Sequence, residues 1–198
     1  MLPIYELKIN EDLDNDTGVD YVALVDFPAI EKDFLAFGKD RLNYAIQDEE
    51  KRIVSGAAMI ADLPIYRNNK KIGEHYTLFS KDTIWKIVKK WSKMQYHNNV
   101  NLMHQTPVEG VYLIESYVSD SERGVKAPAQ FSDIADGSWF LTYYIENEDV
   151  WQKVKDGSFK GFSIEGFFDY EEPNTDEQDF RALLEETIKL IKKYVKID

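Results

Sequence analysis

The sequence predicts a mostly β fold of the α+β class, in which a β-barrel or sandwich is covered by a few helices. Short runs rich in Val, Ile, Tyr and Phe recur along the chain, separated by turns that contain Gly, Pro, Asn or Asp. Three stretches show helical periodicity. Because strands and helices do not alternate in βαβ order, a doubly wound sheet is disfavoured.

The N-terminal part is expected to supply mainly strands. Residues 2–9 alternate loosely and are closed by the acidic turn NEDLDNDTG, and the run VDYVALVDFPAI that follows ends at Pro28. The segment EKDFLAFGK is expected to add a short helical turn. Further strands are predicted at about 42–47, 52–61 and 74–79. The basic stretch RNNKKIGE before the last of these is expected to be a loop.

The clearest helix is predicted to begin after Ser80 and to run to about Tyr96. Serine is a favoured N-cap, and Asp82 in the first turn suits the helix dipole. The apolar positions recur at helical spacing: Ile84, Ile87, Val88 and Trp91. A shorter helix, EDVWQKVKD, is expected to be capped by Asn147 and ended by Gly157.

The C-terminal half is expected to supply four more strands, at 99–104, 110–118, 138–145 and 160–169. The polar segment 119–137 joins two of them. Loops of this length in a compact domain are often functional, so we consider it a source of backbone N–H groups for an oxyanion. Trp139 and Trp151 are interpreted as packing residues.

The chain divides into a folded domain over 1–170, an acidic linker over 171–175 and a C-terminal amphipathic helix over 176–198. Thr175 and Gln178 form a capping box, and the lysines of this segment lie late, as the helix dipole prefers. Such a helix docks on the domain, dimerises or leads toward another protein, and docking is the default expectation.

Composition excludes several classes of function. The 198 residues carry 36 acidic and 24 basic side chains, a net charge of −12, which argues against a nucleic-acid partner. With no cysteine, disulfides and thiolate chemistry are excluded. The N-terminus lacks the pattern of a signal peptide, and no apolar run is long enough to span a membrane. A soluble, intracellular protein is therefore expected.

A serine and a histidine on separate predicted strands are the minimum equipment for covalent acyl transfer. Ser163 lies between large apolar residues in GFSIEG, which has one residue too many for the G-x-S-x-G elbow. On spacing alone, Ser163 is an ordinary strand serine and His104, flanked by apolar residues, a core histidine. His75 and His97 are expected to be exposed. No histidine pair has the spacing of a helical metal site, so we expect neither a metal nor another cofactor.

Several carboxylates are available to orient an imidazole. They are Asp20, Asp26, Glu115, Glu165 and Asp169. Glu115 stands out because it interrupts an apolar strand face one strand after His104. Most acidic residues in proteins are simply solvated, and the sequence alone does not show which of these five would orient the imidazole.

The chain resembles the XkdF-like serine proteases of tailed phages, a branch of the prohead, or capsid maturation, proteases. The resemblance covers about 20–169 and rests on VDYVALVDFPAIEKDFLAF, VSGAAMIADLPIYR, VNLMHQ followed by GVYLIESY, and GSWFLTYYIENEDVWQKVKDGSFKGFSIEGFF. It implies a herpesvirus-assemblin-like antiparallel β-barrel surrounded by helices. It also implies that Ser163 is the nucleophile and His104 the base.

The chain departs from the related proteases at the third catalytic residue. They carry an acidic residue after the serine, in a stretch resembling E-V-S-L-V-x-x-P-A, whereas this chain has YVALVDFPA near its start. We therefore hypothesise a circularly permuted order, in which the N-terminal strand fills the missing position. The aligned position is then Tyr21, which is not acidic, so the adjacent Asp20 is the candidate acid, with Glu115 as the alternative.

The resemblance implies endoproteolysis of scaffold and major capsid proteins inside assembling proheads in the host cytoplasm, by a homo-oligomer that needs no nucleic acid or membrane. A catalytically inactive structural or scaffold-associated head protein with the same fold is the alternative. The absent acid after the serine favours this alternative. A barrel that binds a small ligand is a third hypothesis, which rests only on the 14% aromatic content.

Overall fold

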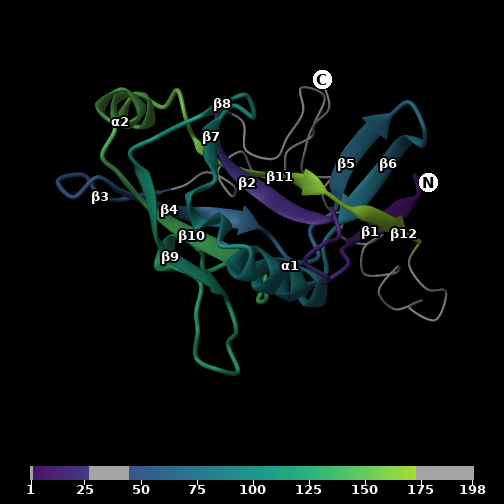
Figure 1. Cartoon of the computed structure of the whole chain (residues 1–198). Helices are drawn as coiled ribbons and strands as arrows, with labels where there is room; N and C mark the ends of the chain where they lie inside the picture. The colour runs from purple at the N-terminus through teal and green to yellow at the C-terminus, as the bar shows by residue number, and fades with distance from the viewer. Residues whose placement is uncertain (1, 27–44, 173–198) are drawn as a thin grey trace, which may run out of the picture.

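The computed structural model describes residues 2–26 and 45–172 (Figure 1), and within them the chain is mostly β, as predicted. The strands are β1 (Ile4–Lys8), β2 (Gly18–Val25), β3 (Ala45–Asp48), β4 (Ile53–Met59), β5 (Ile65–Asn69), β6 (Gly73–Leu78), β7 (Val100–Leu102), β8 (Thr106–Pro107), β9 (Val111–Val118), β10 (Trp139–Ile145), β11 (Gly161–Phe167) and β12 (Asp169–Glu171). The helices are α1 (Lys81–Lys93) and α2 (Glu148–Lys155), with short 3-10 turns η1 (Tyr96–Asn98) and η2 (Ala129–Phe131).

The strands form three sheets of four strands. Their orders are β12-β1-β6-β5, β3-β4-β10-β9 and β11-β2-β7-β8. Most neighbours are antiparallel, but β1 and β6 are parallel, and so are β2 and β7. In the part of the chain that the structure describes, these sheets do not close into one barrel. The mostly β prediction is confirmed, whereas the barrel has no support from this arrangement.

Both described helices begin where their capping residues predict. The Ser80 side chain accepts a hydrogen bond from the Thr83 N–H, and the Asn147 side chain accepts one from the Val150 N–H. Each cap satisfies a backbone donor that the first helical turn leaves free. Gly157, with a φ of +76°, follows the C-cap of α2 and ends it as expected.

The main core lies where β2, β4, β10 and β11 face α1 and α2. Trp91 of α1 and Trp139 of β10 pack edge to face with ring centroids 5.0 Å apart, and Tyr143 packs against Phe162 of β11 at 5.3 Å. Trp139 and Trp151 are both buried, which confirms their interpretation as packing residues. Such buried aromatic pairs contribute about 0.5–1.5 kcal/mol each beyond the area that they bury.

A buried lysine fixes the turn between β1 and β2. The Lys90 ammonium donates to the carbonyl oxygens of Asn10, Asn15 and Thr17 at 2.9, 2.7 and 2.7 Å. A buried charge is tolerated when all its donors are satisfied, as they are here. Because β2 starts at Gly18, this contact ties the start of β2 to helix α1.

Three local predictions differ from the structure. The stretch interpreted as a loop, RNNKKIGE, is largely a hairpin of β5 and β6, whose turn is closed by the Asn69 side chain. The strand predicted over 99–104 ends at Leu102, and the strand over 160–169 breaks at Phe168. The predicted helical turn EKDFLAFGK, most of the linker and the helix over 176–198 lie outside the described residues.

Candidate active site

Strand β11 carries Ser163 and Glu165 on the same face. Side chains two residues apart point to the same side of a strand. Ser163 lies opposite Ala23 of β2, and Glu165 lies opposite Tyr21. Only 6% of the Ser163 surface is exposed, so the serine that the sequence singled out is nearly buried.

A small side chain separates the serine from the third strand of the sheet. Ala23, fully buried, is paired on one side with Ser163 and on the other with Asn101 of β7. Adjacent strands are about 4.8 Å apart, and alanine leaves the space above β2 open. Side chains of β7 and β11 therefore reach each other across β2.

His104 lies in a tight turn between β7 and β8, and not on the predicted strand. Met103 and His104 have φ angles of +55° and +57°, and the Gln105 N–H donates to the Leu102 carbonyl at 3.1 Å. Each left-handed non-glycine residue costs about 1–3 kcal/mol and persists only where its surroundings impose it. Here the Asn101 side chain accepts from the His104 N–H at 3.1 Å. The turn aims the imidazole toward β11.

The carboxylate in contact with His104 is Glu165. Its Oε2 lies 3.3 Å from Nδ1 of His104 and accepts from the Asn101 Nδ2 at 2.9 Å. An ionised carboxylate can only accept, so this contact favours the tautomer with its proton on Nδ1. Nε2 then carries the lone pair that a general base needs. Asn101 joins both partners, since it holds the backbone of His104 and the carboxylate of Glu165.

Neither acid that the sequence suggested is placed against His104. Glu115 is an exposed residue of β9, paired with Thr142 in another sheet. Asp20 is near Glu165, but among the described residues it makes no side-chain hydrogen bond to His104. Two signals pointed to the observed arrangement. Glu165 is two residues from Ser163, and Asn101 is three residues before His104, a spacing at which an asparagine side-chain oxygen can accept from a backbone N–H, as it does at a helix N-cap.

A glycine makes the approach of β2 and β11 possible. The register of the two strands shifts between Glu165 and Gly166, which leaves Asp20 without a partner on β11. A Cβ on Gly166 would overlap the carbonyl oxygen of Gly18 and lie 3.0 Å from the Val19 Cα. Such bulges re-aim side chains, and this one follows Glu165 directly.

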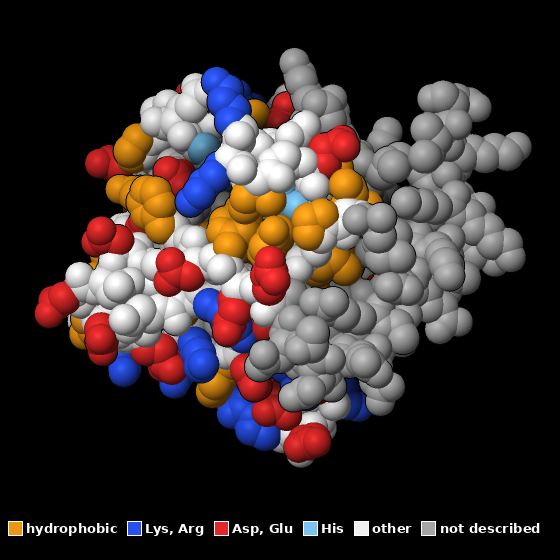
Figure 2. Space-filling view, turned by 90° about the vertical axis from the view of Figure 1, so that its right-hand side faces the viewer, with side chains coloured by type: hydrophobic (Ala, Val, Ile, Leu, Met, Phe, Trp, Pro, Cys, Tyr) orange, Lys and Arg blue, Asp and Glu red, His pale blue; other side chains and the backbone are white. Residues whose placement is uncertain are grey.

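Ser163, His104 and Glu165 line one cavity of about 520 Å³. This volume is in the range of ligand sites in proteins. The lining is largely apolar, with residues from β1, β4, β5, β11 and β12, the segments that adjoin them and the β7–β8 turn. Part of its wall is visible from outside, since Tyr170 is 45% exposed. Figure 2 shows hydrophobic side chains gathered on the side of the molecule that carries β1, β5, β6 and β12.

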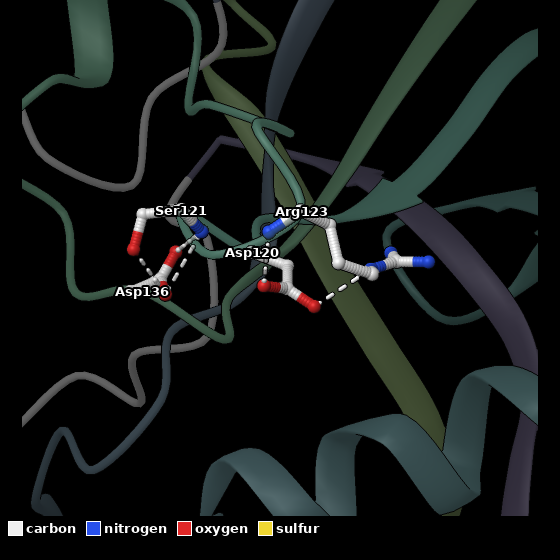
Figure 3. A network of polar contacts seen from close by, with 4 residues as sticks. All are labelled: Asp120, Ser121, Arg123 and Asp136. Atoms are coloured by element: carbon white, nitrogen blue, oxygen red, sulfur yellow. Dashed lines mark hydrogen bonds and ion pairs between the residues drawn. The ribbon is translucent and has the colours of Figure 1, made fainter.

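The segment 119–137 is held by its own polar contacts. Asp120 accepts from the backbone and side chain of Arg123 at 3.1 and 2.7 Å, and Asp136 accepts from the N–H and hydroxyl of Ser121 (Figure 3). The Arg123 N–H and guanidinium lower the pKa of Asp120. No residue of this segment is among the described residues that line the cavity. Oxyanion donors from this segment therefore have no support in the structure.

The other two histidines are not part of this cluster. His75, expected to be exposed, is fully buried between Tyr5 and Tyr170, with Nδ1 2.8 Å from the Gly73 carbonyl. His97 packs its ring on Trp91. Within residues 2–26 and 45–172, no group of three His, Asp or Glu side chains is arranged to hold a metal ion. None of the helices in these ranges has the length and apolar character needed to cross a membrane.

Replacing Asp20 by asparagine is expected to raise the thermal midpoint at pH 7. Burial raises the pKa of the Asp20 carboxyl, and the carboxylates of Glu165 and Asp16 raise it further. The native state therefore holds this proton more tightly than the unfolded chain does. The free energy of unfolding then falls as pH rises from about 3.9, the unfolded pKa, through the raised native pKa.

The gain from Asp20→Asn should be complete above the native pKa and vanish near pH 3, as thermal melts across this range will show. Asp14→Asn removes the same charge from an exposed site in the preceding turn and serves as the control. An Asp20→Asn chain that is less stable than the wild type at pH 7 would contradict this account.

The chain matches the model of a known protein family. A family model described as "putative phage serine protease XkdF" matches residues 43–172, which is most of the chain and includes Asn101, His104, Ser163 and Glu165. The comparisons with curated proteins and with solved structures gave no match.

Proposed function

The chain belongs to the family described as "putative phage serine protease XkdF", and on that premise we propose that it is a serine endopeptidase with Ser163 as nucleophile, His104 as general base and Glu165 as the orienting acid. One observation carries the proposal. The His104 ring is held by Glu165 at 3.3 Å in the same cavity that Ser163 lines.

The proposed reaction requires the His104 ring to come within hydrogen-bonding reach of the Ser163 hydroxyl, because the two side chains share the cavity but make no hydrogen bond to each other among the described residues. His104 Nε2 takes the proton of the Ser163 hydroxyl as Oγ attacks the scissile carbonyl, which gives a tetrahedral oxyanion. When the intermediate collapses, the C–N bond breaks and the imidazolium gives its proton to the leaving amine. Water then attacks the acyl-enzyme by the same route, with His104 again as base. Glu165 stabilises the imidazolium in both halves, and Asn101 keeps Glu165 and the His104 turn in register.

The finer assignment follows the resemblance. We propose that the substrates are phage scaffold and major capsid proteins, which are cleaved during head assembly. We also propose that the protease is a homo-oligomer and that its fold is related to that of herpesvirus assemblin. The pairing of β2 with β11 supports the permutation hypothesis, because it puts the strand with YVALV beside the strand with Ser163.

One observation favours the alternative, a non-enzymatic phage head protein. With 6% of its surface exposed, Ser163 offers little access to a substrate carbonyl. In this alternative the polar cluster around Glu165 serves only to fix the β7–β8 turn.

A fluorophosphonate probe separates the two functions. The folded wild-type chain is expected to gain one adduct, located on Ser163 by peptide mass spectrometry, because only an activated serine reacts. Ser163→Ala should remove the adduct and His104→Gln should slow its formation strongly. Ser158→Ala, at an exposed serine, should label like the wild type. A folded wild-type chain that stays unlabelled would reject the protease and favour the structural protein.

A further inference from the structure

We propose that Arg67 is a specificity residue, which selects peptide substrates with an acidic side chain. The inference rests on the proposed function, because it concerns the cavity that holds Ser163, and it names the class of substrate. The side chains that line this cavity come from two walls with different charge.

The first wall belongs to the sheet β12-β1-β6-β5. Ile65, Arg67 and Asn69 alternate along β5, so they share a face, and all three line the cavity. The residue opposite Arg67 on β6 is His75, which is fully buried. The face of β5 with Arg67 is therefore the inner face of the sheet, and the side chain emerges at the cavity.

Within residues 2–26 and 45–172, the charge of Arg67 has no partner. Among the described residues that line the cavity, Arg67 is the one Lys or Arg, and it makes no ion pair or side-chain hydrogen bond within the described part of the chain. It is half-buried, where a charge is less screened than on an open surface. A guanidinium presents five N–H donors in a planar fork that matches a carboxylate.

The second wall carries the opposite charge. Glu165 is the acidic residue of the described lining, and its Oε2 is already bound by Asn101 and His104. Its negative charge would repel an acidic side chain of a substrate that is bound next to Ser163. An acidic group is therefore favoured on the β5 side of the cavity and disfavoured at the serine.

The net charge of the chain indicates that a preference for acidic peptides would need a local cause. A chain with a charge of −12 repels acidic peptides at long range. Any preference for an acidic substrate must then come from a local cation, and Arg67 is the one that the described lining offers.

Positional-scanning octapeptide pools with Glu, Gln or Lys fixed at each position in turn test the proposal. With the wild-type chain, we expect kcat/KM for Glu over Gln to be about 10-fold or more at one position, as a charged hydrogen bond gives. Arg67→Gln should bring this ratio close to one. Arg67→Glu should make Lys the preferred residue at the same position. Lys71→Gln, at an exposed lysine in the β5–β6 turn that does not line the cavity, should keep the wild-type ratio.

A binding measurement separates failure of this proposal from failure of the protease assignment. The same pools are bound to the immobilised Ser163→Ala chain, and retained peptides are counted by mass spectrometry. Glu pools should be enriched over Gln pools, and a second substitution, Arg67→Gln, should remove the enrichment. Equal retention of Glu and Gln peptides would overturn the role of Arg67, even if hydrolysis occurs. Absent hydrolysis together with Arg67-dependent retention would overturn only the protease. Thermal melts confirm that each variant is folded.

Discussion

Glu165→Gln is expected to lower kcat/KM for peptide hydrolysis by roughly 10³- to 10⁴-fold, the loss seen when the acid of a Ser-His-acid triad is made neutral. The glutamine amide keeps the size of the side chain and can donate to Nδ1 of His104. The tautomer with its proton on Nε2 is then favoured, and this nitrogen cannot take the proton of Ser163. The imidazolium also loses its counter-charge. Initial rates on a peptide that the wild type cleaves measure the effect.

The three candidate carboxylates are distinguished by the same assay. Asp20→Asn and Glu115→Gln are expected to stay within a few-fold of the wild type, because neither residue contacts His104 among the described residues. Asn101→Ala should fall between, since it loosens both the His104 turn and Glu165. Full activity in Glu165→Gln would remove the third catalytic role from Glu165, and a large loss in Asp20→Asn would return that role to Asp20.

Gly166→Ala is expected to destabilise the fold by at least about 3 kcal/mol, in the upper range of overpacking substitutions. The new methyl group would overlap the carbonyl oxygen of Gly18, which is backbone and cannot rotate away. Relief requires β2 and β11 to separate at the bulge. For a domain of this size, such a loss lowers the thermal midpoint by roughly 6–12 °C. Differential scanning calorimetry measures the shift.

Gly124→Ala is the matched control for this substitution. Gly124 has a φ of +77°, and a Cβ added there would have nothing within 4 Å, so alanine costs backbone strain alone, about 1–2 kcal/mol. A Gly166→Ala chain that melts with the wild type would show that β2 and β11 do not approach as closely as described. Where Gly166→Ala still folds, it should also lose activity, because the bulge follows Glu165 directly.

Local patterns in the sequence were enough to predict most of the secondary structure. Ser80, Asn147 and Gly157 predicted helix ends correctly because caps are local hydrogen bonds and local backbone angles. Alternating β-branched and aromatic residues predicted most strands, because this alternation is also a local pattern along the chain. The family resemblance drew attention to Ser163 and His104, which the structure brings to one cavity. Their catalytic roles stay a prediction.

The way the site is built depends on strand pairing, which no local pattern reveals. His75, expected to be exposed, is buried because it lies on the inner face of β6, between Tyr5 and Tyr170 of the neighbouring elements. Glu165 was one of several carboxylates in the sequence. It became the partner of His104 because β2 lies between β7 and β11, Ala23 leaves the space above β2 open, and two left-handed residues turn the imidazole toward β11. These strand pairings bring together residues that are far apart in the sequence. Local patterns along the chain do not show which distant residues will be neighbours in space.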